Sequence, residues 1–189
     1  MRFLFIQILL TSFLISSGIL RTDGRIIINE NNEKVILKGF GLGGWLVLEG
    51  YMWNFPGFGS TTTMENAVID LLGEQKADLF FERYRSNYIT EKDISFLAEN
   101  GFNALRIPLH YKHFSPSFNE FTDIGFDLLE PIINACRDND MYVVLDMHAA
   151  PGAQNTSDFS DSDEQEARLF TQYSNQKWYV STWRYIAEH

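Results

Sequence analysis

The sequence of 189 residues predicts an α/β fold built on a parallel sheet. The strongest indication is the segment 142–155, in which an apolar strand runs directly into a polar loop that turns at Pro151 and Gly152. A second indication is the alternation of expected strands and helices, which is typical of parallel sheets. The third is that Asp146 and His148 alternate onto one face at the strand's carboxyl end, where α/β barrels carry their chemistry.

The N-terminal residues 1–18 have the pattern of a secretory signal peptide. Arg2 gives a positive start, an apolar run follows from Phe3 to Ile15, and residues 16–18 are small, as a signal peptidase requires. The apolar run is shorter than the roughly 20 residues that span a bilayer, which favours a cleaved signal over a membrane anchor. We therefore expect a signal peptide at 1–18, one domain at 19–189 and secretion of the protein.

The composition excludes some partners. The chain is 45% hydrophobic and 15% aromatic, which is enough to form a packed core. Its formal charge of −10 argues against nucleic acid or an anionic membrane as a partner, because both attract basic surfaces. Cys136 is the single cysteine and lies in an apolar helical stretch, so a buried structural thiol is expected. No zinc-ligand spacing and no phosphate-binding loop occurs, so we expect no metal and no organic cofactor.

The expected elements follow in order along the chain. Residues 25–29 and 34–38 flank an Asn-rich turn and predict a β-hairpin. Residues 39–48 are an apolar, glycine-rich run that predicts a strand. Residues 62–86 predict one or two helices. Thr90 can cap a further helix that ends at Asn100 and Gly101.

The remaining pattern continues the alternation. It predicts a strand over 102–109, a helix over 124–138, a strand over 141–147 and helix again over 163–188. Within the second of these strands, Val143, Val144 and Leu145 are expected to be covered on both faces. About three parallel strands result, whereas a closed eight-stranded barrel needs roughly 250 residues. We therefore interpret the chain as the N-terminal part of a longer protein.

Two polar side chains lie at strand ends. Arg106 follows Leu105 in an otherwise apolar strand, and its guanidinium must find a carboxylate or a bound anion. It either orients a catalytic carboxylate or forms a structural salt bridge. His148 is compatible with a ligand-binding imidazole, a general base or a satisfied core histidine, and its place beside Asp146 before a turn favours a role in a site.

Glu49 stands among aromatic residues, close to Tyr51 and Trp53. Rings that stack on a pyranose and a carboxylate that accepts hydroxyl hydrogen bonds are typical of sugar binding, although a surface glutamate is the simpler reading of Glu49 alone. Asn155 opens a formal glycosylation acceptor. The acidic residues 158–166 predict a solvated turn, because the ligand spacing of an EF-hand is absent.

Four motifs, in order, resemble glycoside hydrolase family 5, and in particular its exo-β-1,3-glucanase-like branch. They are LKGFGLGGWLVLE at 37–49, GFNALRIP at 101–108, VLDMH at 144–148 and APGAQN at 150–155. The resemblance implies a (β/α)8 TIM barrel, of which the first three or so βα units are present after an N-terminal β-hairpin. It also implies a carbohydrate substrate, a β-glucan or a related oligosaccharide.

The resemblance also implies roles for individual residues. Arg106 resembles the arginine that supports the nucleophilic glutamate, and His148 the histidine that contacts the sugar at the cleavage point. Glu49 and Tyr51 match positions that enclose the non-reducing-end sugar. Asn155, which ends the fourth motif, is assigned to the same substrate-binding set.

The catalytic residues themselves are not in this sequence. The family uses two glutamates with retention of configuration, and the acid/base lies in an Asn-Glu-Pro motif that this chain lacks. Both glutamates are expected beyond His189, so the chain alone is expected to be inactive. The sequence thus predicts part of a secreted, monomeric, retaining β-glycosidase. The alternative is a non-catalytic carbohydrate-binding protein on a degenerate barrel.

Overall fold

The computed structural model describes residues 19–55, 57, 59–162 and 166–189. The chain divides into two compact units, Met1–Ile36 and Leu37–His189. The signal peptide expected at 1–18 lies outside the described residues and stays a prediction.

The first unit contains a small antiparallel sheet with the strand order β1-β2-β3. Its strands are β1 (Arg21–Asp23), β2 (Ile26–Ile28) and β3 (Lys34–Val35). In the β2–β3 turn, the Asn29 side-chain oxygen accepts hydrogen bonds from the Asn31 and Glu33 amides. The predicted hairpin is therefore confirmed, and β1 adds a strand that its short, exposed sequence did not reveal.

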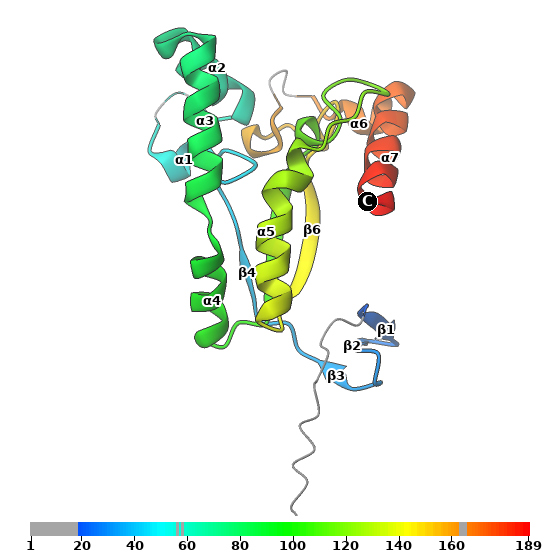
Figure 1. The fold of residues 1–189 in the computed structure, drawn as a ribbon. Coiled ribbons are helices and arrows are strands. Elements are labelled where there is room, and N and C mark those ends of the chain that lie inside the picture. Colours follow the sequence, from blue (N-terminus) through cyan, green and yellow to red (C-terminus); the bar gives the residue numbers. More distant parts are fainter. Residues whose placement is uncertain (1–18, 56, 58, 163–165) are drawn as a thin grey trace, which may run out of the picture. The chain divides into compact units, whose positions relative to one another are not determined.

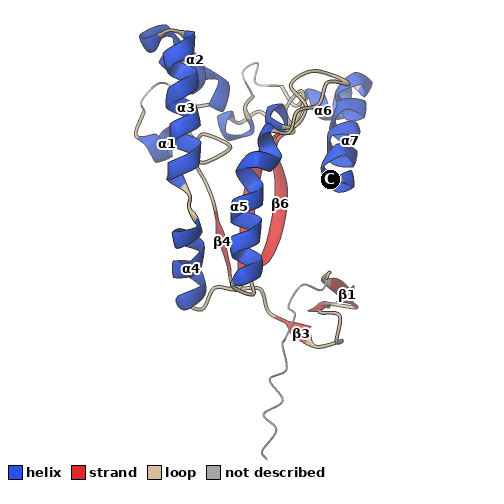
Figure 2. Ribbon diagram, viewed as in Figure 1, coloured by secondary structure: helices blue, strands red, loops and turns tan. Residues whose placement is uncertain are grey.

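The second unit contains a parallel sheet with the strand order β4-β5-β6 (Figure 2). Its strands are β4 (Gly39–Gly41), β5 (Ala104–His110) and β6 (Tyr142–Ala149). The predicted three parallel strands are confirmed, but the strand expected over 39–48 is wrong beyond its start. The chain turns at Gly44, which has a φ of +72°, and Leu48 is held outside the sheet by hydrogen bonds with Thr61.

The helices connect the parallel strands as the sequence predicts (Figure 1). Between β4 and β5 lie α1 (Gly50–Trp53), α2 (Thr61–Leu72), α3 (Glu74–Tyr88) and α4 (Glu91–Glu99). Between β5 and β6 lie the 3-10 turn η1 (Tyr111–His113) and α5 (Ile124–Asp138). After β6 come η2 (Asp158–Ser160), α6 (Arg168–Thr171) and α7 (Tyr173–Glu188). The helix expected over 163–188 is thus interrupted at Gln172, and its first residues, 163–165, lie outside the described residues. None of the helices in the described part of the chain is both long and apolar enough to cross a membrane.

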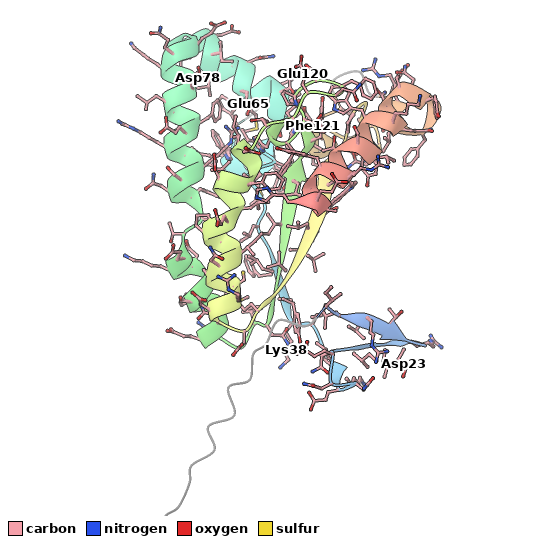
Figure 3. All side chains as sticks on the ribbon, turned by 45° about the vertical axis from the view of Figure 1, so that its right-hand side comes forward. Asp23, Lys38, Glu65, Asp78, Glu120 and Phe121 are labelled. Atoms are coloured by element: carbon pink, nitrogen blue, oxygen red, sulfur yellow. The ribbon has the colours of Figure 1, made fainter. Side chains whose placement is uncertain are left out.

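Local chemistry accounts for where these helices begin and which side they bury. The Asp93 carboxylate accepts hydrogen bonds from the Thr90 amide and hydroxyl, both 2.8 Å, at the predicted start of α4. Along α3, Ala77 is buried, while Asp78 next to it (labelled in Figure 3) is exposed. The alternation of apolar and polar residues therefore directs one side of the helix toward the core.

The core lies on one face of the parallel sheet. Leu105, Ile107 and Leu109 of β5 are fully buried in a cluster with side chains of α4 and α5. In β6, Val143 and Leu145 pack on the same cluster, but Val144 is 44% exposed. The expectation that all three were covered on both faces is wrong for Val144, because alternate residues of a strand point to opposite faces.

Close packing at the start of α5 yields a stability prediction. A Cβ at Gly125 would lie 2.3 Å from Cε1 of the buried Phe114 ring. We expect Gly125→Ala to lower the free energy of unfolding by about 1–3 kcal/mol, because neither ring nor helix can yield. Glu130→Ala, at an exposed position of the same helix, should stay within about 0.5 kcal/mol of the parent. Urea unfolding measures both, and an unchanged Gly125→Ala would contradict the packing.

Candidate active site

Arg106, Asp146 and His148 form a polar cluster on the face of the sheet opposite the core. Arg106 Nη2 forms an ion pair with Asp146 Oδ2 and lies 3.0 Å from His148 Nδ1. His148 Nδ1 lies 2.9 Å from the same Asp146 oxygen. All three side chains keep contact with solvent, with exposed fractions of 45%, 33% and 26%. The structure thus brings together Arg106 and His148, two of the residues that the sequence selected. Arg106 was expected at a strand end but is the third residue of β5, and its long side chain reaches Asp146 near the end of β6.

Backbone features of the strands make this cluster possible. Pro108 pairs with Asp146 and Leu109 with Met147, but His110 pairs with Ala149, so His148 is an extra residue in a β-bulge. A bulge re-aims the side chain it carries. On the neighbouring strand, Gly41 lies beside Arg106, and an added Cβ there would be in ordinary van der Waals contact with Nη1, at 3.7 Å.

The cluster leaves the second nitrogen of the imidazole for a ligand. Nδ1 carries at most one proton, so it either donates to Asp146 or accepts from Arg106. In a neutral ring, Nε2 is an acceptor in the first case and a donor in the second. Within the described residues, Nε2 of His148 has no hydrogen-bond partner. The imidazole is therefore oriented by its neighbours and can contact a hydroxyl-bearing ligand.

Glu49 and Tyr51 form a second pair at the start of α1. The negative charge of Glu49, followed by a hydrogen bond between the two side chains, raises the pKa of Tyr51. Glu49 is partly buried, whereas the Tyr51 side chain is 77% exposed. Tyr51 and Asp158 line a common pocket of about 480 Å³. Tyr51 therefore faces the loop that follows β6, although Tyr51 and this loop are far apart in the sequence.

Asn155 has a structural task within that loop. Its side-chain oxygen accepts hydrogen bonds from the Ser157 amide and the Ser160 hydroxyl, both 2.8 Å. The oxygen is thus engaged by the loop itself, and a contact between Asn155 and substrate stays a prediction. Gln154, to which the sequence gave no role, bonds the His148 carbonyl and accepts a hydrogen bond from the Ala150 amide at 3.2 Å.

Phe159 is a residue of the site that the sequence did not single out. Its ring lies near parallel to the His148 ring, with centroids 6.2 Å apart and an angle of 24° between the planes. The side chain is 42% exposed. In the sequence, Phe159 could be noticed only as a lone aromatic residue within an acidic segment. That observation points to the site only once the structure shows that this loop returns to β6.

Asp161 corrects the prediction that residues 158–166 form a solvated turn. Its side chain is 5% exposed and lies 3.0 Å from Nε2 of the buried His110. It also accepts hydrogen bonds from the Thr62 amide at 2.6 Å and hydroxyl at 2.7 Å, and lies 3.4 Å from Lys112 Nζ. The acidic composition suggested solvation, but these partners come from distant elements that composition does not reveal.

These contacts also set the ionisation of Asp161. Burial alone would raise the pKa of this carboxyl. The hydrogen bond and charge of His110, followed by the hydrogen bonds from Thr62, outweigh burial and hold the pKa of Asp161 well below its ordinary value. The carboxylate is therefore charged at neutral pH and attracts all three partners.

The structure gives no indication of metal chemistry in the part it describes. Within residues 19–55, 57, 59–162 and 166–189, no three His, Cys, Asp or Glu side chains are grouped to hold a metal ion. Cys136 is buried as predicted, and burial raises the pKa of its thiol to about 11. A thiol in this state is protonated and unreactive at neutral pH.

Removing the charge of Asp146 and of Asp161 should have sharply different effects on the free energy of unfolding. Asp146→Asn breaks a partly exposed ion pair, so we expect a loss of less than about 1 kcal/mol. Asp161→Asn leaves the partners of a buried carboxylate unsatisfied, and we expect a loss of about 3–5 kcal/mol. Urea unfolding near neutral pH compares the two variants. Equal losses would show that burial does not separate the clusters.

The stabilisation by Asp161 should depend on pH. Because its pKa is depressed in the folded state, the stabilisation is complete above the unfolded pKa of about 3.9 and is lost as pH falls below it. The stability difference between the parent chain and Asp161→Asn should therefore shrink as pH falls from about 4 toward about 2. Urea unfolding at several pH values measures it, and a constant difference would contradict a depressed pKa.

Comparison with known proteins gives relatives over most of the chain. A β-xylosidase of Phanerodontia chrysosporium is 32% identical over 172 residues, which cover 90% of this chain and 36% of that protein. A probable glucan 1,3-β-glucosidase A of Aspergillus clavatus is 33% identical, covering 75% of this chain and 34% of that protein. A glucan 1,3-β-glucosidase of Candida oleophila is 31% identical, covering 73% and 36%. The chain thus spans about a third of the length of these relatives.

A solved structure supports the fold described above. The crystal structure of rutinosidase from Aspergillus niger aligns with a TM-score of 0.67 and 19% identity over 79% of this chain and 43% of that one. The model of the family Cellulase (glycosyl hydrolase family 5) matches residues 62–189, which include β5, β6 and the Arg106–Asp146–His148 cluster. This match and the relatives over most of the chain show that it belongs to glycosyl hydrolase family 5.

Proposed function

We propose that the chain forms the N-terminal part of a retaining β-glycosidase that acts on a β-glucan or a related oligosaccharide. The observation that carries this proposal is the Arg106–Asp146–His148 cluster, in which Arg106 from the first half of β5 reaches Asp146 and His148 near the carboxyl end of β6. It presents an oriented imidazole and a guanidinium on the sheet face away from the helical core. Membership of the family supports hydrolysis of a glycosidic bond as its use.

Each site residue has a proposed task. His148 binds a sugar hydroxyl through Nε2, while Asp146 and Arg106 fix its ring. Arg106, which is 45% exposed, also supports the catalytic nucleophile once that residue is present. Glu49 and Tyr51 enclose the sugar at the non-reducing end, which favours action from a chain end. Asn155 belongs to the same pocket, chiefly as the residue that shapes its loop.

The bond-breaking groups are proposed to lie outside residues 1–189. Retaining glycosidases use two carboxyl groups about 5–5.5 Å apart, one as acid/base and one as nucleophile. The sequence has no Asn-Glu-Pro motif, and the chain spans about a third of the length of its relatives. The reaction then proceeds by double displacement through a glycosyl-enzyme intermediate, with no metal or organic cofactor.

The wider setting follows from the same proposal. Residues 19–189 contribute the first three or so βα units of a (β/α)8 barrel, and residues 1–18 direct secretion. The partner is a carbohydrate, and the protein acts as a monomer. The names of the fungal relatives, one a β-xylosidase and others glucan 1,3-β-glucosidases, make β-xylosides and β-1,3-glucans the substrates to test first.

A second candidate is a non-catalytic carbohydrate-binding protein on a degenerate barrel. The absence of an Asn-Glu-Pro motif from the sequence favours it if no catalytic glutamate follows. Such a protein would keep the sugar contacts of His148, Glu49 and Tyr51 but would hydrolyse nothing.

Hydrolysis by the product of the complete open reading frame tests the proposal. Laminari-oligosaccharides, cello-oligosaccharides and aryl β-xylosides are offered in parallel, and at least one should be cleaved with retention. Loss of one hydrogen bond in His148→Ala should lower kcat/KM by about 10- to 100-fold. Asn134→Ala, on α5, serves as the control and should match the parent. Sugar binding without hydrolysis would favour the second candidate, and neither binding nor hydrolysis would refute both.

A further inference from the structure

We infer that Asp161 is a positioning residue that fixes the loop 155–161 and so holds Phe159 against His148 in the sugar pocket. The assignment of a sugar to this pocket rests on the proposed function. The placement of Phe159 by Asp161 does not, because it follows from contacts within the chain. The two parts can therefore be tested separately.

One end of the loop is fixed by the Asp161 carboxylate. It binds Thr62 at the start of α2, His110 at the end of β5, and Lys112 in η1, with distances between 2.6 and 3.4 Å. The Thr62 amide is one of the N–H groups that the first turn of a helix leaves unpaired, and a carboxylate is favoured there. Three separate elements of the fold thus hold a single side chain.

The other end of the loop is fixed by Asn155. Its side-chain oxygen accepts a hydrogen bond from the Ser157 amide. The Ser160 hydroxyl lies 2.8 Å from this oxygen and 2.8 Å from the Ser157 carbonyl, and its single proton is shared between these two acceptors. The Asp161 amide then donates to the Asp158 carbonyl at 2.9 Å, with Asp161 at a φ of +56°. The turn 158–161 therefore ends at Asp161, whose carboxylate is buried.

Between these two ends the loop presents Phe159. The ring lies near parallel to that of His148, with the centroids 6.2 Å apart, while Phe159 remains 42% exposed. An exposed ring face beside a sugar-binding imidazole is suited to stack on the apolar face of a pyranose. Because the loop is already fixed, its ordering costs little when the sugar binds.

If Asp161 only stabilised the fold, its substitution would have a different effect on Phe159. In that case, loss of the carboxylate lowers the stability of the fold, but the remaining folded molecules keep Phe159 next to His148. If Asp161 positions the loop, the folded molecules themselves lose the contact between the rings. The contact must therefore be observed directly in the folded state.

Nuclear Overhauser contacts between the rings of Phe159 and His148 provide this observation in the full chain. Asp161→Asn should lose these contacts, and Thr62→Val, which removes one of its hydrogen bonds, should weaken them. Asp138→Asn has the same charge change at an exposed position and should keep them. Retention of the contacts in folded Asp161→Asn would overturn the inference. If that variant does not fold, unchanged contacts in Thr62→Val would overturn it.

Binding of laminaritriose, measured on the same samples, separates the two parts. Phe159→Leu and Asp161→Asn should each weaken binding by about two- to tenfold, whereas Asp138→Asn should not. If the parent shows the ring contacts but binds neither laminaritriose nor xylotriose, the positioning by Asp161 stands and the proposed function fails. Equal affinity in the parent and Asp161→Asn would remove Asp161 from the pocket.

Discussion

The register between β5 and β6 is the constraint on which the rest of the structure depends. It places Leu105, Ile107 and Leu109 on the face that the helices cover, and Arg106 on the opposite face, where it meets Asp146. A shift by one residue would bury the guanidinium and expose the leucines, at a large cost in free energy. The same burial of apolar side chains that stabilises the sheet therefore also selects which side carries the polar cluster.

The site is completed by departures from regular structure. The pairing of β5 and β6 shifts register at His148, whose ring meets Arg106 and Asp146, and the loop that follows returns to the sheet through Asp161. Two kinds of polar pair result. The partly exposed Arg106–Asp146 pair leaves groups for a ligand, whereas the buried His110–Asp161 pair is shielded and serves to hold the chain in place.

The sequence predicted much of this arrangement and missed what depends on long-range contacts. Hydrophobic periodicity located α5 to the residue, and the alternation in 142–149 placed Asp146 and His148 on one face. The sequence predicted one strand over 39–48 because the run is apolar. Its apolar side chains are in fact buried in a loop, and a buried loop and a buried strand have the same apolar composition. Asp161 read as solvated because Thr62 and His110, its partners, are distant in sequence and carry no local signal.

The central claim is that the polar face of this sheet is one wall of a sugar pocket. The most direct test is to add laminaritriose to the isotopically labelled chain and to follow the side-chain resonances of Arg106, His148 and Phe159. The account predicts that these resonances shift together and saturably, while those of the buried Leu105 and Ile107 stay unchanged. Shifts confined to the helical side of the sheet, with Arg106 and His148 unaffected, would contradict it.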